Sequence, residues 1–248
     1  MKRLFDFVAS IIGLFVASPV LIPVMFLVWI QDGHSPLYFA SRVGKHGTHF
    51  KMIKLRSMVA NADKSGVDST GADDLRITPL GHFIRRYKLD ELTQLWNVLL
   101  GHMSLVGPRP NVQRETDLYT TVELKLLTVK PGITDFSSIV FSDESDILKD
   151  QLEPDIAYNQ LIRPGKSLLG LFYIENHNLL LDIRLCWLTL MAIVSRQMAL
   201  SKIQKLLKSL GADESLLELA ARRKPLTPKP PPGATEIVVS REAKPVVK

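Results

Sequence analysis

The sequence contains a single cysteine among its 248 residues, Cys186, and this residue lies in an apolar run. One cysteine excludes a disulfide framework within the chain and any cysteine-based zinc site. We expect Cys186 to be a buried, inert thiol. The sequence also lacks an internal repeat, an aromatic-rich strand and a recognition-helix motif, so we expect no nucleic-acid partner.

The chain is basic, with a net charge of +6 and a sequence pI near 9.4. That balance indicates a polyanionic partner, and the candidates are an anionic membrane surface, a phosphorylated substrate or nucleic acid. The length suffices for one domain with appendages. Hydrophobic residues make up 46% of the chain, and the excess is concentrated near the N-terminus.

An almost unbroken apolar segment covers residues 4–30. As a straight helix it would just span a bilayer core of about 30 Å. Pro19 and Pro23 each remove a backbone donor within it, which predicts a sharp bend. The hydroxyl of Ser18 is free to bond a carbonyl that the prolines release.

Basic residues flank this segment on both sides, at positions 2–3 and at five positions between 42 and 56. Each basic flank prefers the cytoplasmic side of a membrane. A re-entrant helix that breaks at Ser18 and Pro19 and leaves on the face it entered satisfies both flanks, whereas a spanning helix satisfies one. A cleaved signal peptide is the main alternative, but the run is too long, Asp6 sits at its start and no A-x-A site ends it.

Residues 38–55 alternate loosely around a glycine-containing turn and predict a short hairpin. Lys54 and Arg56 belong to a strip of basic residues at the end of this hairpin. Such a strip can bind either a substrate or anionic lipid headgroups. Residues 61–74 are polar and small, typical of a loop that closes over a site.

A helical region is expected over residues 80–100, starting after Thr78 and Pro79. Within it, Asp90 and Glu91 lie about 100° apart on the helix, so both reach one pocket. Arg85 and two further cations precede them, which suits an anionic substrate that needs a carboxylate beside it. The alternative is a solvated helical face with arginine–glutamate pairing.

Arg109 stands between two prolines, Pro108 and Pro110. Prolines on both sides fix the backbone, and a rigid turn that presents a guanidinium can hold a phosphate bidentately. Further helices are expected over residues 118–129 and 151–162, the second ending at residues 163–166. The apolar run 168–196 contains charged residues, which favours a helix buried against the domain or lying on the membrane interface over a second span.

The expected fold is mainly α with a small β-hairpin. Its parts are a re-entrant membrane helix over residues 1–33, a compact cytosolic catalytic domain over 34–200 and an amphipathic helix over 201–223. A proline-rich tail over 224–248 has no periodic apolar pattern, so we expect it to be disordered. We also expect a chain truncated after Lys224 to keep its chemistry.

Four stretches, taken in order, resemble the bacterial sugar transferases known as short-form monotopic phosphoglycosyl transferases. They are Lys2-Arg3-x-x-Asp6 before the Ser18-Pro19 break; Lys54-Leu55-Arg56-Ser57-Met58; Leu89-Asp90-Glu91-Leu92-x-Gln94-Leu95-x-Asn97-Val98-Leu99-x-Gly101-x-Met103-Ser104-Leu105-Val106-Gly107-Pro108-Arg109-Pro110; and Lys130-Pro131-Gly132-Ile133-Thr134. The resemblance covers roughly the first 200 residues.

The resemblance implies transfer of a phospho-sugar from a UDP-sugar to polyprenyl (undecaprenyl) phosphate with release of UMP, as the first step of exopolysaccharide, capsule, O-antigen or glycoprotein glycan assembly. It implies that Asp90 is the nucleophile and forms an aspartyl phospho-sugar, with Glu91 as its partner. Magnesium is the implied cofactor, held by this pair. The cations implied to bind phosphate are Arg85, Arg109, Lys54 and Arg56.

The implied location is the bacterial inner (cytoplasmic) membrane, in contact with lipid and with the catalytic domain on the cytoplasmic face. A homodimer and downstream glycosyltransferases are further candidate partners. The sequence departs from the family pattern after Thr134, since residues 135–145 lack the usual glycines and arginine. A non-catalytic membrane scaffold of a glycan-assembly complex is the alternative function.

Overall fold

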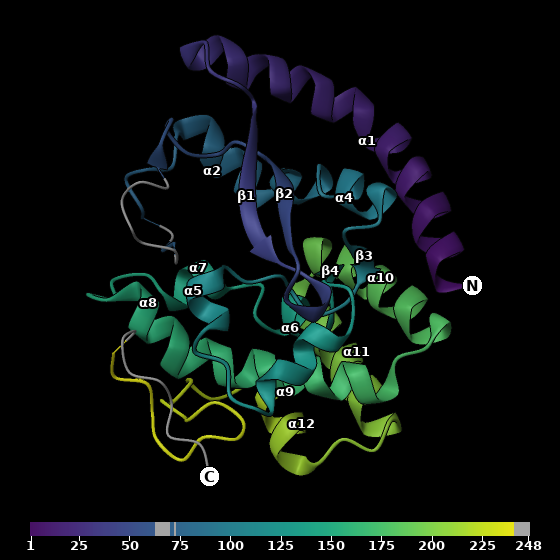
Figure 1. Ribbon diagram of the computed structural model, residues 1–248, viewed down its shortest axis with the longest axis vertical. Helices are drawn as coiled ribbons and strands as arrows, with labels where there is room; N and C mark the ends of the chain where they lie inside the picture. Colours follow the sequence, from purple (N-terminus) through teal and green to yellow (C-terminus); the bar gives the residue numbers. More distant parts are fainter. Residues whose placement is uncertain (63–69, 72, 241–248) are drawn as a thin grey trace.

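The computed structural model describes residues 1–62, 70–71 and 73–240. Its first element is α1 (Lys2–Asp32), a single helix that arcs along the edge of the molecule (Figure 1). Ser18 Oγ donates a hydrogen bond of 2.8 Å to the carbonyl of Phe15. That carbonyl lacks its helical partner because Pro19 has no backbone N–H. The Ser18 hydroxyl therefore bonds a carbonyl released by a proline, as predicted. The expected break at Ser18 and Pro19 is absent, because α1 curves there but stays one uninterrupted helix.

Both ends of α1 are bound to the body of the protein. At the start, Lys2 Nζ lies 2.5 Å from Asp182 Oδ2, and Arg3 donates to backbone carbonyls at the end of α4 (Leu95–Leu100). At the other end, the Arg56 guanidinium pairs with both carboxylate oxygens of Asp32, at 2.5 and 2.6 Å. The two contacts join both helix ends to one folded unit.

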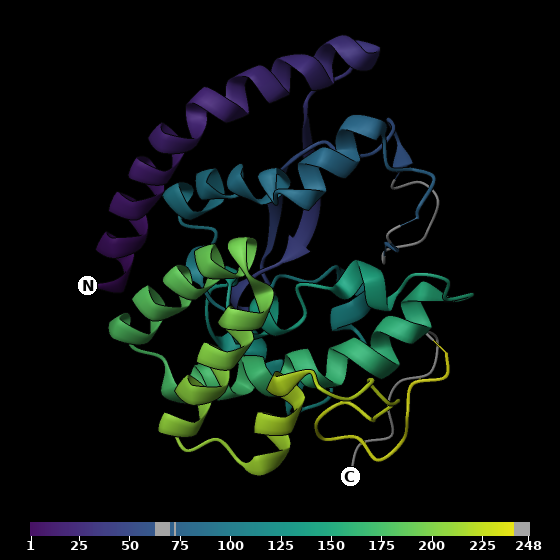
Figure 2. The same cartoon turned by 180° about the vertical axis from the view of Figure 1, so that it is seen from behind.

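Between its ends, α1 is two-sided. Leu21, Val24 and Val28 are buried against the short helices that follow the hairpin, and Figure 2 shows α1 arching over those helices from behind. The opposite face exposes a continuous set of large apolar side chains: Leu4, Phe7, Val8, Ile11, Ile12, Phe15, Val16, Val20, Ile22, Phe26, Leu27, Trp29 and Ile30. Among the described residues, α1 is the one helix long and apolar enough to cross a membrane.

The predicted hairpin is confirmed. Strands β1 (Leu37–Val43) and β2 (His49–Leu55) pair antiparallel, with Leu37 opposite Leu55 and Val43 opposite His49. The turn between them is the short 3-10 segment η1 (Lys45–Gly47).

A second, parallel pair was not predicted: β3 (Ser104–Val106) lies beside β4 (Gly132–Thr134). At its end Gly107 donates to the Thr134 carbonyl at 2.9 Å and Gly132 donates to the Pro108 carbonyl at 3.0 Å. A Cβ atom on Gly132 would lie 2.1 Å from the Gly107 nitrogen. Only glycine fits such an approach, so the sequence motifs around residues 107–110 and 130–134 form one backbone junction.

The region expected to be one helix over residues 80–100 consists of three: α2 (Pro79–Arg86), α3 (Leu89–Leu92) and α4 (Leu95–Leu100). The predicted start is confirmed, because the Thr78 side chain accepts the Gly81 N–H at 2.9 Å. Lys88 adopts a left-handed conformation with φ of 55° and ends the first segment. The expectation of an uninterrupted helix was therefore wrong.

The remaining helices form the main core. They are α5 (Gln113–Thr116), η3 (Glu123–Thr128), α6 (Phe136–Val140), α7 (Glu144–Ile147), α8 (Pro154–Ala157), the π turn η4 (Tyr158–Ile162), α9 (Arg163–Asn176), α10 (Leu179–Val194), α11 (Arg196–Ser209) and α12 (Glu214–Ala221). The helix expected over residues 118–129 is only the 3-10 segment η3. The helix expected to end at residues 163–166 instead continues into α9, and α10 buries Asp182 while exposing an apolar outer face.

Burial raises the pKa of the Cys186 thiol, in α10, to about 12. The thiolate is the reactive form of cysteine. The raised pKa agrees with the expected inert role.

The C-terminal region belongs to the same core. The segment 201–223 does not form one helix. It consists of parts of α11 and α12, joined by a turn in which Gly211 has a φ of 82°.

Residues 224–240 have no helix or strand, yet they lie against the body of the protein. Gln160 Nε2 donates to the Val238 carbonyl at 2.8 Å, and Lys229 donates its N–H to the Gln160 carbonyl at 3.0 Å. That carbonyl is left open by Pro164. This packed stretch corrects the expected disorder for residues 224–240. Residues 241–248, and positions 63–69 and 72 of the predicted loop 61–74, lie outside the described residues.

Candidate active site

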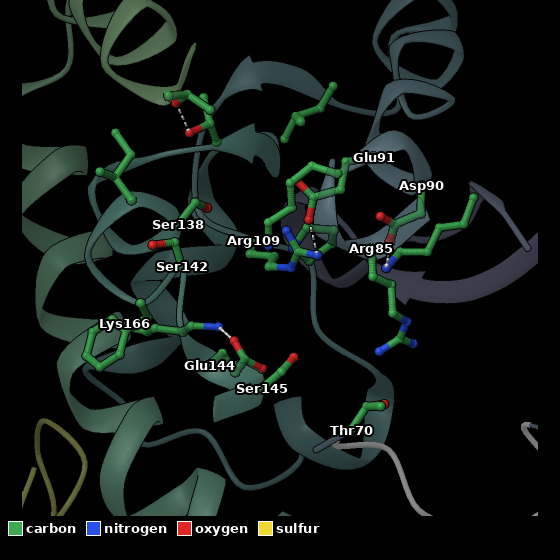
Figure 3. A pocket seen from close by; sticks show the side chains of 18 of the residues that line it. Thr70, Arg85, Asp90, Glu91, Arg109, Ser138, Ser142, Glu144, Ser145 and Lys166 are labelled. Carbon is green, nitrogen blue, oxygen red and sulfur yellow. Dashed lines mark hydrogen bonds and ion pairs between the residues drawn. The ribbon is translucent and has the colours of Figure 1, made fainter. Parts of the chain in front are cut away.

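A cavity of about 490 Å³ lies between the turn into α3, the Arg109 loop, α6–α7 and the facing sides of α9 and α10. Its volume falls within the roughly 300–1,000 Å³ typical of small-molecule sites. Figure 3 shows Asp90, Glu91 and Arg85 on one side, Arg109 between, and Lys166 and Glu144 on the other. Five of the six predicted catalytic and phosphate-binding residues line this cavity: Lys54, Arg85, Asp90, Glu91 and Arg109.

The two adjacent carboxylates are each matched to a different cation. Lys54, on β2, places Nζ 3.6 Å from Asp90 Oδ2, and Arg109 places Nη2 2.9 Å from Glu91 Oε1. The left-handed conformation of Lys88 interrupts the helix and starts α3 immediately before them, and both side chains line the cavity. The predicted shared pocket is present, but a tight turn creates it rather than a long helical face.

The electrostatics of these pairs favour ionised groups. Burial alone would raise the pKa of Glu91, but Arg109, and then Lys88 and Lys54, outweigh it and hold that pKa at about 2. The Glu91 carboxylate raises the pKa of Arg109 more than burial lowers it. Burial lowers the pKa of Lys54 to about 8 although Asp90 opposes the shift, so Lys54 is still mainly protonated at neutral pH.

Arg85 and Arg109 are held by different means. The Nε of Arg85 donates to Ser57 Oγ at 3.0 Å, and burial lowers the pKa of its guanidinium, an effect that Asp90 and Asp74 partly offset. Arg109 follows the junction between Gly107 and Gly132, which fixes the backbone from which its side chain projects. Both guanidinium groups reach the cavity, where donors in a planar fork suit phosphate oxygens.

Arg56 is not brought to this cavity. Its guanidinium pairs with Asp32 and donates from Nε to the Ser35 carbonyl at 2.8 Å, so it anchors the end of α1. The sequence could not separate this use of an arginine from phosphate binding. Ser18 and Pro19 likewise lie in the middle of α1 and outside the cavity.

Sequence reasoning missed the far side of the cavity. Lys166 pairs there with Glu144, and Ser138, Ser142 and Ser145 line the same side. The sequence pattern assigns Lys166 only to the end of a helix. These residues come from α6, α7, α9 and the loops between them, and no local pattern in the sequence joins them.

No group of three or more histidine, cysteine, aspartate or glutamate residues suited to a metal ion occurs in the described part of the chain. Mg²⁺, however, is commonly bound by one or two carboxylates together with substrate phosphates and water. Asp90 and Glu91 both face the cavity, and the contact of Asp90 with Lys54, at 3.6 Å, is too long for a hydrogen bond. The pair therefore fits a magnesium ion whose other ligands come from a phosphorylated substrate.

Comparison with known proteins identifies the family to which the chain is similar. Residues 1–196 match the family described as bacterial sugar transferase. The chain is 33% identical to the exopolysaccharide production protein ExoY of Sinorhizobium fredii, over 77% of this chain and 84% of that protein. It is also 33% identical to the uncharacterized sugar transferase EpsL of Bacillus subtilis, over 78% of this chain and 87% of that protein.

The chain is similar, too, to enzymes named for their acceptor. It is 42% identical to the undecaprenyl-phosphate galactose phosphotransferase of Salmonella typhimurium over 54% of this chain and 31% of that protein. The match to the UDP-galactose-lipid carrier transferase of Erwinia amylovora, at 40% identity, covers the same shares of the two chains. The chain thus spans about a third of the length of these two relatives. Arg196, where the family match ends, lines the cavity, so the match includes the carboxylate pair and every cation around it.

Proposed function

The chain belongs to the bacterial sugar transferase family, and from this premise we propose that it transfers a phospho-sugar from a UDP-sugar to undecaprenyl phosphate and releases UMP. Relatives named as undecaprenyl-phosphate sugar phosphotransferases support the acceptor. The observation that carries the proposal is the adjacent carboxylate pair, Asp90 and Glu91, facing one cavity with Lys54, Arg85 and Arg109. Three cations at that point suit a substrate with two phosphates.

In the proposed reaction, an oxygen of the Asp90 carboxylate attacks the phosphorus that bears the sugar. The bond between that phosphorus and the bridging oxygen of the diphosphate breaks, and UMP leaves with the electron pair. A phosphate oxygen of the acceptor lipid then attacks the same phosphorus, which regenerates the free carboxylate and forms the lipid diphosphate sugar. A carboxylate attacks an anionic phosphate slowly unless nearby cations screen the repulsion.

The residues around Asp90 supply that screening. The ammonium of Lys54, 3.6 Å from the Asp90 carboxylate, attracts the phosphate that this carboxylate must approach. Arg109 and Arg85 offer N–H donors to the phosphate oxygens, and Glu91 holds the Arg109 fork in place. We assign magnesium to Asp90 and Glu91; when bound, it supplies charge neutralisation of the diphosphate and stabilises the UMP leaving group.

We further propose that α1 is a re-entrant membrane helix. At about 1.5 Å per residue its 31 residues extend for about 46 Å, more than the roughly 30 Å of a bilayer core. A helix that crossed would place its ends on opposite faces, yet Lys2 and Asp32 both contact the same folded body. In this proposal the exposed apolar face of α1 enters the lipid, and the basic flanks favour the cytoplasmic face of the inner membrane for the body.

A UMP-release assay tests the proposal. Membranes that contain the protein receive Mg²⁺, undecaprenyl phosphate and one of a panel of UDP-sugars, beside Asp90→Asn and a matched control, Asp117→Asn, at an exposed position outside the cavity. Loss of a nucleophile costs about 10⁴-fold or more in rate. We expect UMP with at least one sugar for the wild type and the control, and none above background for Asp90→Asn. Turnover retained by Asp90→Asn would contradict the mechanism, and UMP absent for every sugar would favour a non-catalytic scaffold.

A further inference from the structure

The side of the cavity opposite Asp90 is a second polar surface, which we call the polar wall. Its members are hydrogen-bonding side chains from α6, α7, α9 and the loop between α6 and α7: Ser138, Ser142, Glu144, Ser145 and Lys166. In Figure 3, Arg109 lies between this wall and Asp90. Four of its five members, all except Lys166, lie within residues 135–145, where the sequence departs from the family pattern.

The hydroxyls of the wall are oriented by contacts behind them. Ser138 Oγ donates to Asp135 Oδ1 at 3.0 Å, so its lone pairs remain for a ligand. Ser142 Oγ accepts from Arg196 Nε at 3.1 Å, so its own hydrogen remains for donation. One hydroxyl therefore offers an acceptor and the other a donor.

Glu144 and Lys166 add a second donor and acceptor while leaving the wall uncharged as a whole. They form an ion pair, and Lys166 Nζ also lies 5.3 Å from the centre of the Tyr158 ring. The side chain of Lys166 is 13% exposed and that of Glu144 is 34% exposed. The ammonium has three N–H donors and the carboxylate two oxygens, so each keeps capacity for a ligand.

The wall is also held in place from behind. Asp143 forms ion pairs with Arg196 and with Arg222, both at 2.9 Å. These contacts tie the turn that carries Ser142 and Glu144 to α11 and to the end of α12. Arg222 lies beyond residues 1–196, which match the family.

The two sides of the cavity thus differ in charge. The side of Asp90 carries an excess of cations for a diphosphate, whereas the wall carries balanced charge with donors and acceptors together. We propose that the polar wall binds the uncharged hexosyl group of the UDP-sugar through its hydroxyls and selects among sugars. This rests on the proposed function. Each sugar hydroxyl both donates and accepts a hydrogen bond. An ion pair supplies partners for both, through the ammonium N–H groups and the carboxylate lone pairs that the pair itself does not use.

The test separates the sugar from the nucleotide, because UMP carries the uridine and one phosphate but no sugar. The variants are Glu144→Gln and Ser145→Ala, with Glu175→Gln and Ser201→Ala as controls at exposed positions outside the cavity. Ser145 makes no hydrogen bond through its side chain within the described residues, so its loss leaves the fold intact. The measurements are kcat/KM of UMP release for UDP-glucose, UDP-galactose and their N-acetylamino forms, and the inhibition constant of UMP.

We expect the preference among the four sugars to change by roughly tenfold to a hundredfold in Glu144→Gln and by less in Ser145→Ala, with the inhibition constant of UMP unchanged and both controls like the wild type. An inhibition constant for UMP that rises together with every KM would overturn the assignment, because the wall would then hold the nucleotide. An unchanged preference in both wall variants would overturn it as well. Failure of the proposed function differs from either result, because the wild type would then release no UMP from any sugar.

Discussion

The first turn of α1 provides a quantitative test of how the membrane helix is attached. Lys2 Nζ lies 2.5 Å from Asp182 Oδ2, and the Asp182 side chain is 1% exposed. In Lys2→Met, the Asp182 carboxylate keeps the hydrogen bond from the Tyr173 hydroxyl, 2.6 Å long, but loses its cation. Removal of one partner from a fully buried pair costs about 3–5 kcal/mol. Because Lys2 is 35% exposed and water screens it, we expect about 2 kcal/mol here.

In a protein of this size, 1 kcal/mol moves the Tm by about 2–4 °C, so Lys2→Met should melt about 4–8 °C below the wild type. The assay is thermal unfolding of the protein in detergent micelles, followed by tryptophan fluorescence. Lys202→Met is the control, since Lys202 is an exposed lysine of α11, and surface changes of that kind stay within about 0.5 kcal/mol.

A double variant sharpens the measurement. Asp182→Asn should also destabilise the protein, but Lys2→Met combined with Asp182→Asn should cost less than the sum of the two, since the second change no longer leaves a buried charge unpaired. A Tm for Lys2→Met equal to that of the wild type, or strictly additive losses, would refute docking of the first turn on the body and the re-entrant arrangement that depends on it.

Three further predictions follow from single contacts. Arg109→Lys keeps the charge but loses the planar fork, so UMP release should fall roughly tenfold to a hundredfold at unchanged Tm; a rate within threefold of the wild type would contradict the clamp. Gly132→Ala places a Cβ 2.1 Å from the Gly107 nitrogen, so it should cost about 1–3 kcal/mol in thermal unfolding, and an unchanged Tm would mean that the strands do not approach so closely. The Arg56 hydrogen bond holds the pKa of Asp32 well below its usual range. That pair therefore stabilises the fold above the ordinary aspartate pKa of about 4 and loses its effect below it, so the Tm gap between wild type and Asp32→Asn should shrink from pH 7 to pH 3; a constant gap would contradict the pair.

Features encoded in local sequence were predictable. Thr78 before Pro79 marks a helix start, and the structure gives the Thr78 side chain that capping bond. Asp6 argued against a signal peptide, and in the structure its buried carboxylate accepts from the Ser104 hydroxyl at 2.9 Å and from the Leu105 N–H at 3.1 Å. The side chain thus attaches α1 to β3, which explains a charge inside an apolar run.

Features that depend on distant contacts were not predictable. The leucine spacing continues across Lys88, so the sequence gives no sign of its left-handed turn, which is uncommon for a residue other than glycine. Glu144 and Lys166 meet across 22 positions of chain, and their pairing follows from how α6, which precedes Glu144, packs on α9. Arg56 shows the same limit, since its partner Asp32 lies 24 positions away.

The central claim is that Asp90 carries the phospho-sugar between two half-reactions. The direct measurement is a single turnover of the purified full-length protein with Mg²⁺ and a UDP-sugar but no acceptor lipid, followed by rapid acid quenching and mass spectrometry of the peptide that contains Asp90. The account predicts a burst of UMP close to one per enzyme molecule and a peptide heavier by one hexose phosphate, with the added mass on Asp90 and removed when undecaprenyl phosphate is supplied. UMP that forms only when the acceptor lipid is present, with no mass added to this peptide, would contradict the covalent route.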